Sequence, residues 1–112
     1  MTFPSSATVE VHSNFFESVR NGSGRSPGFS GSFAVDTIAV GGTVTWKWVD
    51  SGHNVTPYGN TAFVASATEQ VPFTFGPITF SSPGTYLYHC SIHGHFVGFF
   101  GFVGMWGRIV VR

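Results

Sequence analysis

Glycine, proline, serine and asparagine interrupt this chain at short intervals along its whole length, and this punctuation limits the fold it can adopt. The segments between these breaks are short and rich in β-branched and aromatic residues, and none keeps a helical hydrophobic period over the length of a helix. In the segment 43–48, Val44, Trp46 and Trp48 alternate with other residues and therefore share one face of a strand. The pattern predicts an all-β protein, a two-sheet sandwich of about seven to eight strands.

The expected strands lie between turn signals such as Gly41-Gly42 and Ser82-Pro83-Gly84. They cover residues 7–12, 33–35, 36–40, 43–49, 53–56, 73–80, 85–89 and 108–111. A chain of 112 residues is long enough to bury one hydrophobic core, so we expect a single domain over residues 1–112. The glycine- and serine-rich stretch 21–32 is predicted to be a long flexible connection, and no function is assigned to it.

The charge of the chain limits its partners. Only 9% of the residues are charged, five basic residues balance five acidic ones, and the basic residues are scattered, so no nucleic-acid partner is expected. No segment reaches the roughly 18 apolar residues of a membrane-spanning helix, so no transmembrane segment is expected. The first residues lack the basic and apolar regions of a secretory signal, which leaves a cytoplasmic protein or a sequence whose signal has been removed.

The single cysteine, Cys90, cannot form a disulfide within the chain. It directly follows the predicted strand 85–89 and lies three residues before His93, while His53 begins another predicted strand and Met105 precedes the last one. One thiolate, two imidazoles and a weak thioether suit copper that cycles between Cu(I) and Cu(II). A cysteine that only packs in the core is the simpler alternative. A Cys-His hydrolase fits poorly, because no helix follows Cys90 to activate the thiol.

Taken in order, these motifs resemble those of the cupredoxins, the small blue copper proteins of the plastocyanin and pseudoazurin type. The resemblance covers nearly the whole chain, and any one piece of it is weak without the others. The matching pieces are residues 33–46 before the first ligand, Ser51-Gly52-His53-Asn54-Val55 at that ligand, Gly84-Thr85-Tyr86 through Cys90-Ser91-Ile92-His93, and Met105-Trp106-Gly107-Arg108-Ile109-Val110-Val111 at the end.

The resemblance implies a cupredoxin-like Greek-key β-sandwich with one mononuclear type 1 copper ion per chain. It implies that His53, Cys90 and His93 are the equatorial copper ligands and that Met105 is the candidate axial ligand. Asn54 is then a cofactor-binding residue beside the metal, with a side chain that joins the two ligand loops and an amide that faces the sulfur of Cys90. Such neighbours of metal ligands fix the orientation of the ligands and tune the reduction potential.

The chain departs from the plastocyanin pattern between His93 and Met105, where eleven residues replace the usual four. We interpret the seven residues from Phe96 to Phe102 as an apolar insertion in the ligand loop. If the insertion loops out, Met105 closes the site; otherwise the axial position is open or is taken by water, His95 or a backbone carbonyl. Four phenylalanines in this insertion expose about 600 Å² of apolar surface if nothing covers them. Their cover is expected to be the copper site itself, a second subunit, a redox partner or a lipid surface.

Three other histidines receive weaker interpretations. By strand alternation His89 points away from the metal, toward a solvated sheet face, although the resemblance makes this neighbour of Cys90 an alternative electron exit. His95 is interpreted as a loop residue near the ligands and His12 as a structural residue.

The resemblance implies a protein that carries single electrons between redox partners, which dock at the apolar face near His93 and the insertion. An electron carrier is expected rather than an enzyme. The alternatives are an open copper site that binds or converts nitric oxide, nitrite or peroxide, and copper storage or delivery. A third reading is a copper-free β-sandwich that binds a partner. A homo-oligomer formed through the phenylalanine-rich loop and a periplasmic or extracytoplasmic location are further expectations, the signal peptide being absent from this sequence.

Overall fold

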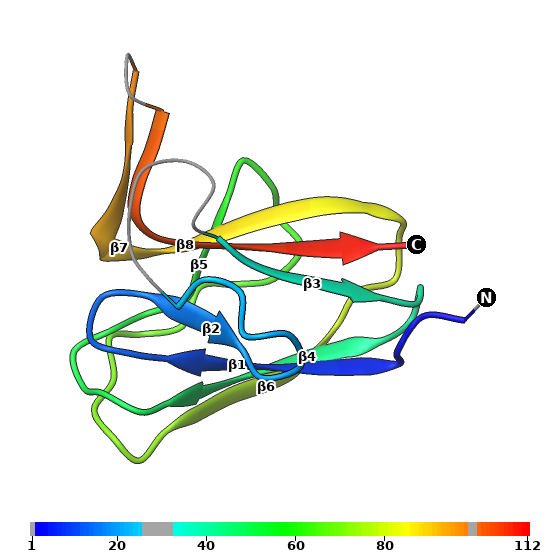
Figure 1. Cartoon of the computed structure of the whole chain (residues 1–112), viewed down its shortest axis with the longest axis horizontal. Helices are drawn as coiled ribbons and strands as arrows, with labels where there is room; N and C mark the ends of the chain where they lie inside the picture. Colours follow the sequence, from blue (N-terminus) through cyan, green and yellow to red (C-terminus); the bar gives the residue numbers. More distant parts are fainter. Residues whose placement is uncertain (1, 26–32, 99–100) are drawn as a thin grey trace.

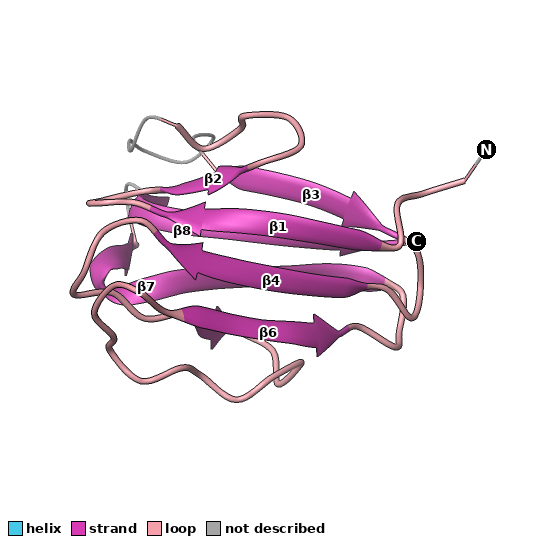
Figure 2. Cartoon of the chain, turned by 90° about the horizontal axis from the view of Figure 1, so that it is seen from below, coloured by secondary structure: helices cyan, strands magenta, loops and turns pink. Residues whose placement is uncertain are grey.

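The computed structural model describes residues 2–25, 33–98 and 101–112, and these residues form strands, turns and loops without a helix (Figure 2). Within this part of the chain there is accordingly no helix that could cross a membrane. The all-β prediction is confirmed, as is the number of strands. They are β1 (Ser6–Val11), β2 (Phe16–Ser18), β3 (Ala34–Ile38), β4 (Thr43–Trp48), β5 (Thr56–Tyr58), β6 (Thr74–Thr79), β7 (Gly84–Val97) and β8 (Gly101–Val111).

The strands form two four-stranded sheets, with the order β2-β1-β4-β6 in sheet A and β3-β8-β7-β5 in sheet B. Strands β1 and β4 are parallel neighbours, as are β3 and β8, whereas the remaining pairs are antiparallel. Figure 1 shows the two sheets as separate layers, with the C-terminus at the end of the sandwich opposite the one where β7 and β8 project from it. Each sheet therefore combines strands from the first and the second half of the sequence, as is common in β-sandwiches.

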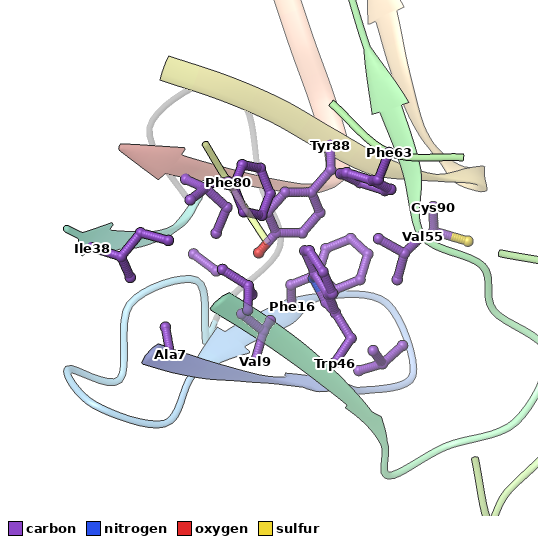
Figure 3. Close-up of a cluster of buried hydrophobic side chains, with 14 of the residues drawn as sticks. Ala7, Val9, Phe16, Ile38, Trp46, Val55, Phe63, Phe80, Tyr88 and Cys90 are labelled. Carbon is purple, nitrogen blue, oxygen red and sulfur yellow. The ribbon is translucent and has the colours of Figure 1, made fainter. Parts of the chain in front are cut away.

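The core lies between the sheets and follows the alternation of the strands. Val44, Trp46 and Trp48 point inward from β4, as their spacing predicts, and each is buried. Trp46 meets Tyr88 of the opposite sheet edge to face, with 5.2 Å between ring centroids. Figure 3 shows this cluster of side chains with Cys90 at one end of it and Val55 nearby. The candidate metal donor is thus anchored at the edge of the packed core.

Several strand boundaries differ from the prediction. The two strands predicted over 33–35 and 36–40 form one strand, β3 (Ala34–Ile38), because nothing interrupts the ladder between them. The short edge strand β2 was not predicted, since three residues give no readable period. His53 lies before β5 in an isolated bridge to Glu69, rather than in the strand predicted for 53–56.

The connection predicted to be flexible over 21–32 is held at its start. Asn21 donates to the carbonyl of Val35 at 2.8 Å, and the N–H of Val35 donates to the hydroxyl of Ser23 at 2.8 Å. These bonds attach residues 21–23 to β3, so the prediction of flexibility is wrong for them. Residues 26–32 lie outside the described part of the chain.

The largest difference concerns the segment interpreted as an apolar insertion: its described residues extend β7 and β8 into a long antiparallel hairpin. The pairs His95 with Val103, Phe96 with Phe102 and Val97 with Gly101 lie in this extension. In Figure 1 the extension stands away from the sandwich. Backbone pairing between the two strands therefore gives regular structure to a segment that was interpreted as part of a loop. Phe99 and Phe100 lie outside the described residues.

Candidate metal centre

The pairing of β7 and β8 is interrupted at one place, a bulge of four residues, 90–93, that face a single residue, Met105. Below the bulge His89 pairs with Trp106, and above it Gly94 pairs with Gly104. Extra residues in one strand leave the ladder and redirect their side chains. The bulge carries Cys90 and His93, and we call residues 90–93 the ligand bulge. Both candidate donors thus lie within one long strand, β7.

Three of the predicted donors converge at this bulge. The Cys90 sulfur lies 3.5 Å from Nδ1 of His93 and 3.8 Å from Nδ1 of His53, which comes from the loop between β4 and β5. All three ligand atoms lie within 4.8 Å of one another. The imidazole rings of His53 and His93 are 4.9 Å apart between centroids. Residues separated by 37 positions in the sequence therefore share one small space.

These distances fit a metal ion held in a trigonal arrangement. With a metal–sulfur bond of about 2.3 Å and a metal–nitrogen bond of about 2.0 Å, donors at trigonal angles lie about 3.7 Å apart. The two separations from the sulfur, 3.5 and 3.8 Å, bracket this value. Two imidazoles and one thiolate are the donor set of blue copper sites. The residues present therefore fit copper by both spacing and chemistry.

Burial favours the form of His53 that binds metal. The residue is 2% exposed, and this burial, followed by the nearby His93, lowers its pKa, while Asp50 acts in the other direction. A neutral imidazole offers a nitrogen lone pair to a cation. The backbone at His53 is also fixed, because its carbonyl accepts hydrogen bonds from Trp48 Nε1 at 3.1 Å and from the N–H of Glu69 at 2.9 Å.

Asn54 ties the two ligand segments together. Its Oδ1 accepts a hydrogen bond from the N–H of Ser91 at 2.9 Å, and its Nδ2 donates to the hydroxyl of Ser91 at 2.9 Å and to that of Thr68 at 3.3 Å. The hydroxyl of Thr56 donates to the same Oδ1 at 2.9 Å. The side chain of Asn54 thus joins the His53 loop to the ligand bulge, as the resemblance implies for this residue.

Met105 lies opposite the ligand bulge and is fully buried in the same core cluster as Cys90. This is the place from which a thioether could approach the donors from β8. The extended hairpin explains how eleven residues separate His93 from Met105 without moving the two apart: the chain runs out along β7 and returns along β8. Axial ligation by Met105 stays a prediction.

Two glycines allow the strands to close above the bulge. Gly104 has a φ of +86°, and a Cβ built on it would lie 2.0 Å from the carbonyl oxygen of His93. A Cβ on Gly94 would lie 2.3 Å from the carbonyl oxygen of Met105. Backbone approaches this close are possible only without a side chain. The glycine spacing could have indicated a close strand crossing here.

The sequence reasoning missed residues that support the donors. Ser91 and Thr68 bind Asn54, and Trp48 binds the backbone at His53. Hydroxyl groups are too common in a chain like this to be identified from spacing alone. His89 points away from the candidate metal centre, as predicted. The prediction of a solvated environment is wrong, because its ring stacks on Trp106 with 4.5 Å between centroids.

His12 has the structural role expected for it. Its Nε2 lies 3.0 Å from Glu10 and 3.3 Å from Glu17 on the outer face of sheet A, and its ring stacks on Phe15. These three side chains could also gather round a cation, but Glu17 is already paired with Arg25 at 2.9 Å. His95 is exposed on the hairpin extension.

No family model and no curated protein matches the sequence, whereas solved structures match the fold. An oxidized amicyanin variant is 23% identical with a TM-score of 0.59 over 99% of this chain and 97% of that chain. A reduced Cu(I) form of another amicyanin variant is 22% identical with a TM-score of 0.56 over 100% of this chain and 92% of that chain. A chain of a heme-copper terminal oxidase dimer is 20% identical with a TM-score of 0.58; the match covers 96% of this chain and 63% of that chain. Similarity at this level of identity establishes a shared fold.

Proposed function

This chain has the cupredoxin fold, and from that premise we propose that it is a type 1 copper protein that holds one copper ion at Cys90, His53 and His93. The observation that carries this proposal is the convergence of one sulfur and two imidazole nitrogens at separations that match a trigonal metal site. When bound, copper supplies a single-electron couple between Cu(I) and Cu(II).

The protein's own residues prepare this site before metal enters. Cys90 is completely buried and would bind as a thiolate, because coordination to a cation removes the thiol proton. Burial lowers the pKa of His53 and so favours its neutral form, its backbone is anchored, and Asn54 joins the two ligand segments. We propose Met105 as the axial ligand, supported by its burial and its position opposite the ligand bulge. A scaffold that fixes its donors in this way keeps the rearrangement on electron transfer small.

We propose that electrons enter and leave at the edge of His93. Of the three donors His93 alone is exposed, which supports it as the route between metal and solvent. Exposed apolar side chains lie near it in the sequence: Ile92 is 50% exposed, and Phe96 and Val97, 51% and 41% exposed, lie on opposite faces of the hairpin extension. We call these three side chains the apolar rim. A rim without charge favours brief complexes that depend little on salt.

The function proposed is single-electron transfer between redox proteins that dock on the apolar rim. We also propose a periplasmic or extracytoplasmic location, as the resemblance implies. Oligomerisation through the hairpin is an alternative use of the same rim, and measurement of the mass of the copper-loaded protein in solution distinguishes the two uses.

Titration of the metal-free protein with Cu(II) tests the proposed site. We expect one equivalent to bind and to produce an intense visible band from charge transfer between the Cys90 thiolate and copper. Cys90→Ser should abolish this band, and His53→Gln should weaken binding by at least about tenfold, because a donor is lost. His95→Gln is the matched control: this exposed histidine stands outside the donor set and its variant should keep the band. A colourless wild-type protein with stoichiometric copper contradicts the proposal.

Addition of azide or nitrite to the Cu(II) protein tests whether the site closes. With Met105 buried opposite the ligand bulge, we expect the visible spectrum to stay unchanged. A saturable spectral shift would indicate an open coordination position and would replace electron transfer with binding or conversion of a small molecule.

A further inference from the structure

The ligand bulge has a second support on the face of sheet B that points away from the donors. Cys90 points into the core, so its neighbour His89 points outward, where it lies directly opposite Trp106 on β8. The two rings stack with 4.5 Å between centroids and 21° between planes. His89 is only partly exposed and Trp106 is 1% exposed, so both belong to a packed aromatic layer on this face.

Each of these rings makes one hydrogen bond that spans an interruption in its own strand. Nδ1 of His89 lies 2.8 Å from the carbonyl oxygen of Gly94, so this bond closes over the whole ligand bulge. A carbonyl oxygen only accepts, and therefore Nδ1 of His89 carries the proton. Nε1 of Trp106 donates to the carbonyl of Val103 at 2.9 Å and spans Gly104 and Met105 on the opposite strand.

The first bond joins the two residues that flank the bulge on β7, and the second runs from Trp106, which flanks it on β8, to Val103, one residue beyond Gly104. His89 and Gly94 are the last regular partners on β7 before and after residues 90–93, and Trp106 is the partner of His89. Residues in a bulge lose ladder hydrogen bonds and need other contacts to hold one conformation. Asn54 supplies such contacts at Ser91 from the His53 loop. His89 supplies one from the outer face.

We propose that His89 and Trp106 form an outer clamp, a pair of positioning residues that fixes the span of the ligand bulge and so holds His93 and Met105 in register with Cys90. Neither residue touches the metal. The clamp acts through the backbone, by fixing the distance from His89 to Gly94 on one strand and from Val103 to Trp106 on the other. The consequence for copper binding rests on the proposed function, whereas the consequence for the backbone does not.

Two substitutions at one position separate the hydrogen bond from the packing. His89→Phe keeps an aromatic ring over Trp106 and removes the donor to Gly94. His89→Asn restores a donor, because the Nδ2 of asparagine occupies nearly the position of the Nδ1 of histidine. Tyr58→Leu is the matched control, since Tyr58 contacts the rings of both His89 and Trp106 in the same aromatic layer without bonding to the bulge.

Amide hydrogen exchange of the metal-free protein is the primary measurement. In His89→Phe we expect the amides of residues 91–93 and 105 to exchange about fivefold faster or more relative to the core strands, with most of the protection restored in His89→Asn. Tyr58→Leu should leave the ratio of bulge to core exchange unchanged. The clamp is overturned if His89→Phe and wild type have the same ratio of bulge to core exchange, or if Tyr58→Leu changes this ratio as much as His89→Phe does. Because the ratio is taken within each protein, this holds even if both variants lose global stability.

Copper affinity and reduction potential provide the second measurement. If the proposed function holds, His89→Phe should bind copper about 10–100-fold more weakly, as outer neighbours of metal ligands commonly do, and should shift the potential; His89→Asn should restore both. Wild-type affinity and potential in His89→Phe overturn the clamp. A wild-type protein that binds no copper would refute the proposed function, while the exchange measurement would still decide the clamp.

Discussion

At the scale of single residues, Met105 tests how the site is closed. Its thioether is buried opposite the ligand bulge, and a weak axial sulfur donor stabilises Cu(II) more than Cu(I) because the ion of higher charge gains more from an added donor. Met105→Leu should therefore raise the reduction potential and perturb the EPR spectrum. The stability of the metal-free protein should fall by less than about 1.5 kcal/mol, since the volume is conserved. An unchanged potential and spectrum would show that Met105 only packs.

Asp36 makes a prediction about pH. Its carboxyl is buried, and this burial raises its pKa although Ser18 donates a hydrogen bond to Oδ1 at 2.7 Å. A raised carboxyl pKa means that the folded state binds the proton more tightly, so the folded state loses stability as pH rises from the unfolded pKa of about 3.9 to the folded value. Asp36→Asn does not titrate and keeps an acceptor for Ser18.

The stability of Asp36→Asn relative to wild type should therefore increase as pH rises through that window, by about 1.4 kcal/mol for each unit between the two pKa values. Urea unfolding of the metal-free proteins at pH 4 and pH 7 measures this difference. A difference that is constant with pH, or that decreases, would mean that the carboxyl is not desolvated as described.

The sequence predicted the donors better than their supports, for a physical reason. Cys90 and His93 lie three residues apart. A thiol and an imidazole at that spacing near the end of a strand are an unusual pair, so the sequence alone indicates them as metal ligands. The partners of Asn54 and the carbonyl that receives His89 depend on which loops meet in three dimensions. Backbone carbonyls carry no sequence signal at all.

At the scale of elements, the closure of the hairpin depends on Gly104. Its positive φ and the approach of the His93 carbonyl leave no room for a Cβ. Gly104→Ala should destabilise the protein by about 1–3 kcal/mol and weaken copper binding, because β8 must move away from the ligand bulge. Gly98→Ala is the control, since a Cβ there meets nothing within 4 Å. Thermal unfolding and copper competition measure both effects; equal behaviour of the two variants would contradict the close crossing.

Strands were predicted correctly where apolar and polar residues alternate strongly. They were missed where hydrogen bonding to a partner strand determines the structure. Strand β4 has large inward residues at every second position, and it begins at its predicted residue. The hairpin of β7 and β8 was missed beyond His89, because residues 96–102, with glycines at 98 and 101, were interpreted as an insertion in the ligand loop. Cross-strand hydrogen bonds between two extended segments outweighed the low strand propensity of these glycines.

At the scale of the whole molecule, the apolar rim should control encounters between copies or partners. Electron self-exchange between the Cu(I) and Cu(II) forms, measured by NMR line broadening, needs no identified partner. We expect the wild-type rate to change by less than about twofold between low and moderate salt, because the chain has no net charge and the rim has none.

Ile92→Lys should slow self-exchange at low salt and make the rate increase with added salt, because two lysines then meet across the contact. Val40→Lys is the matched control: Val40 is 46% exposed and lies beside the C-terminus, at the other end of the sandwich from the hairpin (Figure 1). Equal effects of both lysines would place the contact elsewhere on the molecule.

The central claim is that one sulfur and two imidazole nitrogens from distant parts of the chain bind a single copper ion. X-ray absorption at the copper edge, on protein loaded with one equivalent, tests it most directly. The account predicts one short copper–sulfur bond and two copper–nitrogen bonds, with the short sulfur bond lost in Cys90→Ser. A copper ion surrounded only by nitrogen and oxygen in the wild-type protein would contradict it.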